Sequence, residues 1–384
     1  AQATGGNIYI DETGDLAVGQ IIAGTTGDRK DITLTAGGAI SDYDTTVEGA
    51  GNENLVGGAI SLTAGGAIGA TGNADIDTEA VSLDAKITGA TGGIFITETG
   101  DVTLGSSNTK SGTTESMTTG GGAIEVTSGG NMTVAQAVTT AGNGKIDLTT
   151  TAGNLQVDAE VRAGGDLDLD AAGLLETADG PALSVNDGGL LSAGGAVSLA
   201  ARGGDIALGR VVAGTDADRK NITVTAGGAI SDHDTAAEGA NLVGGDISLT
   251  AGSGIGELGG NADIDTTVDR IDAQTASGGI FIDETGGVTL GTVTTGNGGG
   301  AIEIISGGGM TVAQEVTTAG SGDIRLHTEA GDLLVDTNSE VTAGGDLDLD
   351  AAGRLNIAAA VSGSSVALTG GTGIEHTAAG DVTA

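Results

Sequence analysis

The chain repeats itself at two levels, and this feature restricts the folds available to it more than any other. The stretch AGTTGDRKDITLTAGGAISDYD, which begins at Ala23, returns as AGTDADRKNITVTAGGAISDHD from Ala213. Further matched blocks follow in the same order: 54–69 with 241–256, 92–105 with 278–291, and 132–142 with 310–320. The chain therefore consists of two copies of a unit of roughly 180 to 190 residues. We expect a first long repeat over 1–192 and a second over 193–384, continuous as one solenoid.

A shorter motif recurs within each copy: a Gly-Gly pair, a run of alternating apolar and polar residues, then Ala and another glycine turn. Strict alternation over four to six residues, bounded by glycine, is typical of a strand buried on one face only. In DITLTA it places Ile32 and Leu34 inward and the polar residues outward. Such strands are expected to open at Ile8, Ile32, Ile60, Ile94, Ile124, Ile146, Leu167, Val197, Ile222, Ile247, Ile280, Ile302, Ile324 and Leu347.

A repeat this short cannot bury its apolar face alone and must stack on its neighbours. We therefore predict an all-β fold, a right-handed parallel β-helix with coils of roughly 20–25 residues, each with one or two short strands, and about 17 coils in total. The apolar residues are almost all Ala, Val, Ile and Leu, with only four aromatics and no Trp. Small side chains of this kind suit a narrow core.

The charge of the chain excludes several classes of partner. Asp and Glu number 52 against 13 Lys and Arg, a net charge of −39. Phosphate backbones and anionic membrane surfaces would be repelled, and no apolar stretch approaches the length of a membrane span. We expect no nucleic-acid partner and no membrane insertion. The absence of cysteine excludes disulfides and thiolate metal sites.

The blocks GGAISLTAGGAIG, GGDLDLDAAG and GGNMTVAQAVTTAG resemble the β-helical shaft repeats of large secreted bacterial adhesins of the filamentous haemagglutinin type. The resemblance covers nearly the whole chain. It implies an extracellular location, on the bacterial cell surface or in a secreted matrix. Members secreted by the two-partner route are expected to carry an N-terminal domain with Asn-Pro motifs, and the one proline here is Pro181.

The stretch GGDLDLDAAG, which occurs at 164–173 and 344–353, raises the question of a metal site. Alternation places its aspartates together on the outer face: Asp166, Asp168, Asp170, Asp346, Asp348 and Asp350. Alternate residues of one strand lie about 7 Å apart, too far for all three to bind one ion at about 2.4 Å. A solvated acidic face is the favoured interpretation, with no cofactor or metal site, and weak calcium association stays open.

The rare aromatics recur at one position. Tyr9, Phe95 and Phe281 each stand between two isoleucines, in NIYIDETGD, GIFITETGD and GIFIDETGG. If the isoleucines face the core, the rings face outward, and we expect them either to anchor contacts with a partner or to lie sheltered under a loop.

Other candidate sites carry weaker signals. Arg29-Lys30 and Arg219-Lys220 occupy matched loops and indicate either local salt links or docking points for an acidic partner. His233, His327 and His376 lie far apart in sequence and form no recognisable triad. The sequons at Asn131 and Asn221 are each absent from the other copy. Threonine is frequent without an evident common register, so a flat ice-binding ladder is not expected.

These observations favour a non-catalytic rigid spacer or fibre segment of an extracellular bacterial adhesin or matrix filament. The alternative is a glycan-binding or glycan-cleaving β-helix, since such enzymes use paired carboxylates. The chain begins near one coil and finishes in AAGDVTA, which resembles part of another. Because an uncapped solenoid end exposes strand edges, we expect self-association or continuation through the ends, with a host or neighbouring cell surface as a further possible partner.

Overall fold

The computed structural model describes residues 1–384 apart from 46–50, 106–114, 178–190, 234–238, 260 and 378. Its elements are all strands, stacked in parallel as a β-solenoid of about 15 turns, and the described residues include no helix. The prediction of an all-β parallel solenoid is confirmed, with somewhat fewer turns than expected. Right-handedness stays a prediction, and Pro181 lies outside the described residues.

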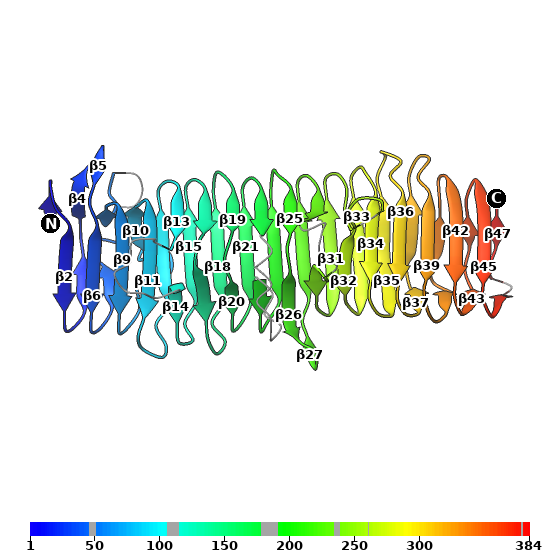
Figure 1. Ribbon diagram of the computed structural model, residues 1–384, viewed down its shortest axis with the longest axis horizontal. Helices are drawn as coiled ribbons and strands as arrows, with labels where there is room; N and C mark the ends of the chain where they lie inside the picture. The colour runs from blue at the N-terminus through cyan, green and yellow to red at the C-terminus, as the bar shows by residue number, and fades with distance from the viewer. Residues whose placement is uncertain (46–50, 106–114, 178–190, 234–238, 260, 378) are drawn as a thin grey trace. The chain divides into compact units, whose positions relative to one another are not determined.

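The chain packs as two compact units, Ala1–Ser198 and Leu199–Ala384. Within each unit the strands lie side by side, coil upon coil (Figure 1). The continuity of the two long repeats as one solenoid stays a prediction, and each unit is described by itself.

Unit 1 contains one series of strands that open at the apolar positions named above or in equivalent places: β2 (Ile8–Glu12), β6 (Ile32–Ala36), β9 (Ala59–Ala64), β11 (Ser82–Ile87), β12 (Ile94–Glu98), β15 (Ile124–Ser128), β18 (Ile146–Thr150) and β21 (Leu167–Ala171). Its other strands are β1 (Gln2–Ala3), β3 (Leu16–Val18), β4 (Ile21–Thr25), β5 (Asp28–Arg29), β7 (Ile40–Asp42), β8 (Leu55–Val56), β10 (Ile76–Glu79), β13 (Val102–Leu104), β14 (Glu115–Thr119), β16 (Met132–Val134), β17 (Ala137–Thr140), β19 (Leu155–Val157), β20 (Val161–Ala163), β22 (Leu175–Thr177) and β23 (Leu191–Ala193). Strand β24 (Val197–Ala201) spans the unit boundary.

Unit 2 repeats this arrangement. Its strands of the first kind are β28 (Ile222–Ala226), β31 (Asp246–Ala251), β33 (Arg270–Thr275), β34 (Ile280–Glu284), β36 (Ile302–Ser306), β39 (Ile324–Thr328), β42 (Asp346–Ala351) and β45 (Ser365–Gly370). The others are β25 (Ile206–Leu208), β26 (Val211–Thr215), β27 (Asp218–Arg219), β29 (Ile230–Asp232), β30 (Leu242–Val243), β32 (Ile264–Thr267), β35 (Val288–Thr295), β37 (Met310–Val312), β38 (Glu315–Thr318), β40 (Leu333–Val335), β41 (Glu340–Thr342), β43 (Arg354–Ile357), β44 (Val361–Ser362), β46 (Gly373–His376) and β47 (Val382–Thr383).

A typical coil has three strands, where the sequence predicts one or two. Strand β15 is followed by β16 and β17, and these stack on β18, β19 and β20 of the next coil. The two shorter strands were missed because a strand such as Met132–Val134 contributes only two inward residues, too few for alternation to stand out. The strands that were predicted from the sequence, such as β15 and β18, form one face of the coil. The two shorter strands of each coil form the other face.

The core is a set of aliphatic ladders that run from coil to coil. Ile124 lies over Ile146, and Val126 over Leu148, with every member of this ladder fully buried. Parallel stacking repeats every 4.7–4.9 Å, so each inward side chain contacts its equivalents in the coils before and after it. Among the described residues, the buried hydrophobic side chains are Ile, Val, Leu, Ala and Met, and none is aromatic.

The two faces exchange roles once in each unit. In unit 1, β11 pairs with both β13 (Leu83 beside Leu104) and β14 (Ala85 beside Met117), so one strand is succeeded by two. On the other face the opposite occurs, because β12 continues both an isolated bridge at Ile68 and strand β10. We refer to this rearrangement as the face exchange.

Unit 2 makes the same exchange. Strand β33 is succeeded by β35, an eight-residue strand that in turn pairs with both β37 and β38. Strand β34 continues both a bridge at Ile255 and strand β32. The exchange is therefore a property of the long repeat, and it places β12 and β34 beside the loops that precede β10 and β32.

Candidate functional site

The three predicted contact residues face outward, as the alternation indicates. Ile94 and Ile96 are buried in the core, and the Phe95 side chain between them is half-buried on the outer surface. Phe281 has the same environment. Tyr9, in contrast, is 67% exposed. The predicted orientation of the side chains is therefore correct, and their role as contact anchors stays a prediction.

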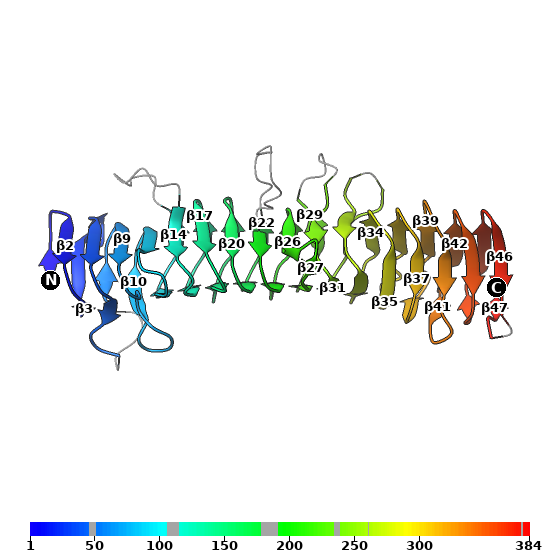
Figure 2. The same ribbon diagram turned by 90° about the horizontal axis from the view of Figure 1, so that it is seen from below.

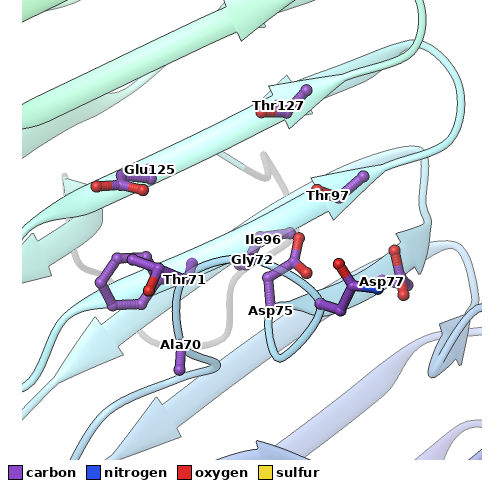
Figure 3. Close-up of a pocket in the computed structure, with 11 residues that line it drawn as sticks. Ala70, Thr71, Gly72, Asp75, Asp77, Ile96, Thr97, Glu125 and Thr127 are labelled. Carbon is purple, nitrogen blue, oxygen red and sulfur yellow. The ribbon is translucent and has the colours of Figure 1, made fainter. Parts of the chain in front are cut away.

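The phenylalanines differ from Tyr9 because a loop lies beside each phenylalanine. Residues 69–75 fold back beside β12 and form, with the outer surfaces of β12 and β15, a groove of about 440 Å³ (Figure 3). We call it the Phe95 groove. Figure 2 shows the blue loops near β10 projecting from the stacked strands. The groove lining includes the aromatic ring, three carboxylates and the outward threonines of β12 and β15: Phe95, Asp75, Asp77, Glu125, Thr97 and Thr127.

The loop is held in place by a glycine in the left-handed region. Gly69 has φ +66°, and a Cβ there would collide with the carbonyl oxygen of Phe95. The loop is closed by the bond from the Ala70 N–H to the carbonyl of Ala74, 2.7 Å. A second glycine, Gly93, lies beneath the ring, because a Cβ there would come within 2.6 Å of Phe95 Cε2. Glycine is thus required at position 69 by backbone conformation and contact, whereas at position 93 it leaves space for the ring in its present orientation.

Charge in and beside the groove is unevenly compensated. The Glu125 carboxylate pairs with Lys145 Nζ at 2.6 Å, and this bond raises the pKa of the lysine. The neighbouring coil places Asp147 beside Asp168, and burial together with that charge raises the pKa of Asp147. Asp75 makes no side-chain hydrogen bond or ion pair with the residues that the structure describes. Figure 3 shows Asp75 rising from the loop toward the strand that carries Ile96.

The aspartates of GGDLDLDAAG lie on the outer face, as predicted, but the first of them has a structural role that the sequence analysis missed. Asp166 Oδ1 accepts the backbone N–H of Ala196 in the next coil at 2.9 Å. The same bond joins Asp205 to Ala229 and Asp332 to Arg354. Asp and Asn after a glycine corner therefore link consecutive coils, and we call this set of bonds the Asx ladder.

Asp168 and Asp170 occupy the outward positions of β21, and Asp348 and Asp350 those of β42. Unit 2 places basic side chains among them: Arg325 lies between Glu303 at 3.3 Å and Asp348 at 3.9 Å, and the His327 ring contacts Asp350 at 3.1 Å. Among the residues with described placement, no three His, Asp or Glu side chains gather where they could hold a metal ion. Calcium association stays an open prediction.

The Arg-Lys pairs occupy two matched antiparallel hairpins, β4–β5 and β26–β27. Arg29 forms an ion pair with Glu79, and Arg219 contacts Asp269 at 3.4 Å. The carboxylate differs in position by two residues between the copies, since Thr267 is the counterpart of Glu79 and Val81 that of Asp269. These ion pairs agree with the local salt-link interpretation.

The sequence analysis overlooked two buried carboxylates. Glu98 and Glu284 follow Ile96 and Ile282 at inward positions, and each is only 1% exposed. Glu98 Oε2 accepts Thr78 Oγ1–H at 2.7 Å and the Ala80 N–H at 2.9 Å, while Oε1 accepts the Gly100 N–H at 3.1 Å. Burial raises the pKa of Glu98 to about 7 and also raises that of Glu284.

Both glutamates lie at the face exchange, where the corner after β10 lacks glycine. Ala80 N–H is buried there, and Glu98 supplies the acceptor it needs. Glu284 accepts the Val268 N–H at 2.9 Å in the same way. The alternation that places Ile94 and Ile96 inward also places position 98 inward, so the sequence pattern could have predicted a buried glutamate there. The third copy of the motif, Glu12, is exposed.

Threonines do share a register over short distances, contrary to the sequence expectation. Thr97, Thr127 and Thr149 stack in consecutive coils, and Asp170 then follows at the same position. The mismatch arose because the threonines are separated by coils of unequal length. Of the sequon asparagines, Asn131 belongs to the Asx ladder, with its Oδ1 accepting the Asn154 N–H at 2.9 Å.

No long apolar helix suited to crossing a bilayer occurs in the described part of the chain. Comparison with protein-family models, with curated proteins and with solved structures found no match to this chain.

Proposed function

We propose that the chain is a non-catalytic spacer or fibre segment of an extracellular bacterial adhesin or matrix filament, which self-associates or continues through its terminal coils. The observation that carries the proposal is the incomplete burial of those coils. Ile8 and Ile10 in β2 are only half-buried, whereas their counterparts Ile94 and Ile96 are buried.

The other terminal coil has the same character. Val366 and Leu368 of β45 are half-buried although Leu347 and Leu349, one coil earlier, are buried. Ile374 is 50% exposed. A strand edge with unpaired backbone groups and accessible apolar side chains is a template for another strand. A further coil, in a longer chain or from a second copy, would bury these side chains.

The aliphatic ladders of each unit support a spacer role, because every coil is fixed by backbone and side-chain contacts to the coils beside it. The high negative charge would oppose lateral clumping while leaving axial contacts available. Release of reducing ends from a polysaccharide by the purified chain would contradict the non-catalytic part of the proposal and favour the glycan-cleaving alternative.

Light scattering and electron microscopy over a range of concentrations test self-association, with Leu368→Lys compared with Thr369→Lys. Both variants add one positive charge to β45, but only the first charges the inward row. We expect assemblies that grow with concentration for the unmodified chain and for T369K, and their loss for L368K. Monodisperse monomers at high concentration would overturn self-association by this chain.

A further inference from the structure

We propose that the Phe95 groove binds an arginine side chain presented by a basic segment of a partner protein. The inference does not rest on the spacer proposal, since it concerns the outer surface of β12 and β15 and not the terminal coils. It rests on the unpaired acid in the groove, the aromatic ring beside it, the size of the groove and the charge of the chain.

Asp75 is the first of these observations. Its carboxylate lies on the groove wall without a side-chain hydrogen bond or ion pair to any described residue. Glu125 is already paired with Lys145, so its charge is partly compensated. A guanidinium presents two parallel N–H donors that match the two oxygens of one carboxylate. Asp75 can therefore accept a bidentate bond from an arginine that enters the groove.

Phe95 supplies the second contact. Guanidinium groups stack on aromatic faces more readily than ammonium groups do, because the planar cation is more weakly hydrated. In a chain with two Phe, two Tyr and no Trp, an outward ring that lines a groove with carboxylates is an uncommon combination. The outward hydroxyls of Thr97 and Thr127 complete the polar lining.

Size and charge are consistent with this ligand. A groove of about 440 Å³ has room for one long side chain with its flanking backbone. The net charge of −39 attracts basic segments over a distance set by ionic strength. An anionic ligand would encounter Asp75, Asp77 and Glu125 together.

Unit 2 provides an internal control. Phe281, Asp263 and Glu303 are the counterparts of Phe95, Asp75 and Glu125, but the segment between Gly256 and Asp263 has one residue more than the segment between Gly69 and Asp75. The exposed Leu258 also replaces Thr71 in the loop. We therefore expect one arginine site per chain, in unit 1.

The test is a fluorescence-anisotropy titration of the full chain with labelled tetra-arginine, tetra-lysine and a neutral tetrapeptide, at two salt concentrations. The variants are Asp75→Asn, Phe95→Leu and the matched controls Asp263→Asn and Phe281→Leu. Leucine retains apolar volume under the loop while removing the ring face, so F95L preserves the fold, which circular dichroism verifies.

We expect tetra-arginine to bind more tightly than tetra-lysine, with D75N and F95L each weakening it by at least 5-fold and the unit 2 variants changing it by less than 2-fold. Equal binding of the two cationic peptides, unaffected by D75N and F95L, would show nonspecific attraction only and overturn the proposal. Binding of a neutral oligosaccharide that F95L abolishes, without arginine binding, would overturn it in favour of a sugar site.

Discussion

At the scale of single residues, the chain uses acidic side chains for two different structural purposes. Asx-ladder members such as Asp166 accept backbone N–H groups at the exposed corners. Glu98 and Glu284 accept them inside the coil, where each glutamate is only 1% exposed. The remaining carboxylates on the outer strands, such as Asp168, contribute mainly charge. Position relative to the corner, and not residue type, therefore determines what each acid contributes to stability.

The buried glutamate makes stability depend on pH. The pKa of Glu98 is raised from 4.5 to about 7, so the folded state favours its protonated form. Stability from this group is greatest below about pH 4.5 and decreases as pH rises to about 7, by on the order of 3 kcal/mol. Glu98→Gln should flatten that part of the stability profile measured by denaturant unfolding. The exposed Glu12→Gln is the control, and equal profiles for the two variants would contradict the assignment.

The Asx ladder predicts opposite effects for two neighbouring aspartates. Asp166→Ala removes the acceptor of the Ala196 N–H and should lower the free energy of unfolding by about 1 kcal/mol. Asp168→Ala should leave it unchanged or raise it, because Asp168 lies beside Asp147 and raises its pKa. Asp166→Asn, which retains the acceptor oxygen, should behave like the unmodified chain. Thermal unfolding followed by circular dichroism distinguishes the three, and a larger loss for D168A than for D166A would refute the ladder.

At the scale of strands and coils, the two copies preserve an interaction while changing the residues that make it. The hairpin arginine binds a carboxylate in both units, but at Glu79 in one and at Asp269 in the other. The matched outward glutamates of β15 and β36 are likewise each paired with a basic side chain: Glu125 with Lys145, and Glu303 with Arg325. The two alternative positions for the hairpin's carboxylate lie on either side of one corner residue, and the contacts in the two units show that a carboxylate at either position can reach the arginine.

This equivalence predicts that the ion pair of unit 1 can be relocated. Glu79→Thr should cost up to about 1 kcal/mol, since the pair is partly exposed. Adding Val81→Asp should restore the loss, because Thr and Asp occupy the matched positions in unit 2. Native-state hydrogen exchange of the β4–β5 hairpin is the measurement, and V81D alone is the control. Failure of the double variant to recover protection would show that the hairpin differs between the units.

Some elements follow from sequence and others do not. Alternation predicts β15 and its inward Ile124 and Val126 correctly, because one face is apolar without interruption. It does not predict β16, which is too short to show a period. The face exchange was also missed, since no glycine pair precedes β11 or β33 to indicate where these strands begin. The outward position of Phe95 was predicted, but the groove depends on loop 69–75, whose path is set by the single φ of Gly69.

At the scale of the whole molecule, the net negative charge opposes contact between copies of the chain. The chain carries −39 at neutral pH and has an isoelectric point of about 4.1. Charge repulsion between molecules extends about 10 Å at 0.1 M ionic strength. Whether copies meet laterally or through terminal coils should therefore respond to solution conditions.

Acid and salt should promote lateral association in different ways. Lowering the pH toward 4.1 removes net charge, and raising ionic strength to 1 M shortens the repulsion to about 3 Å. We expect turbidity to increase in both cases and to reverse on return to neutral pH and low salt. Circular dichroism should retain its strand signal throughout. Association accompanied by loss of that signal would indicate unfolding and contradict the charge explanation.

The face exchange has a consequence for how such chains could change over time. A duplication that adds one coil away from the exchange lengthens a unit but leaves the five-residue strands on the same sheet. A duplication or deletion that includes the exchange transfers them, and the outward residues they carry, to the opposite sheet. Whether the number of exchanges is odd or even would thus specify which of the two sheets displays a given set of outward residues. A single recombination event between repeats could change that number by one and move those residues to the other sheet.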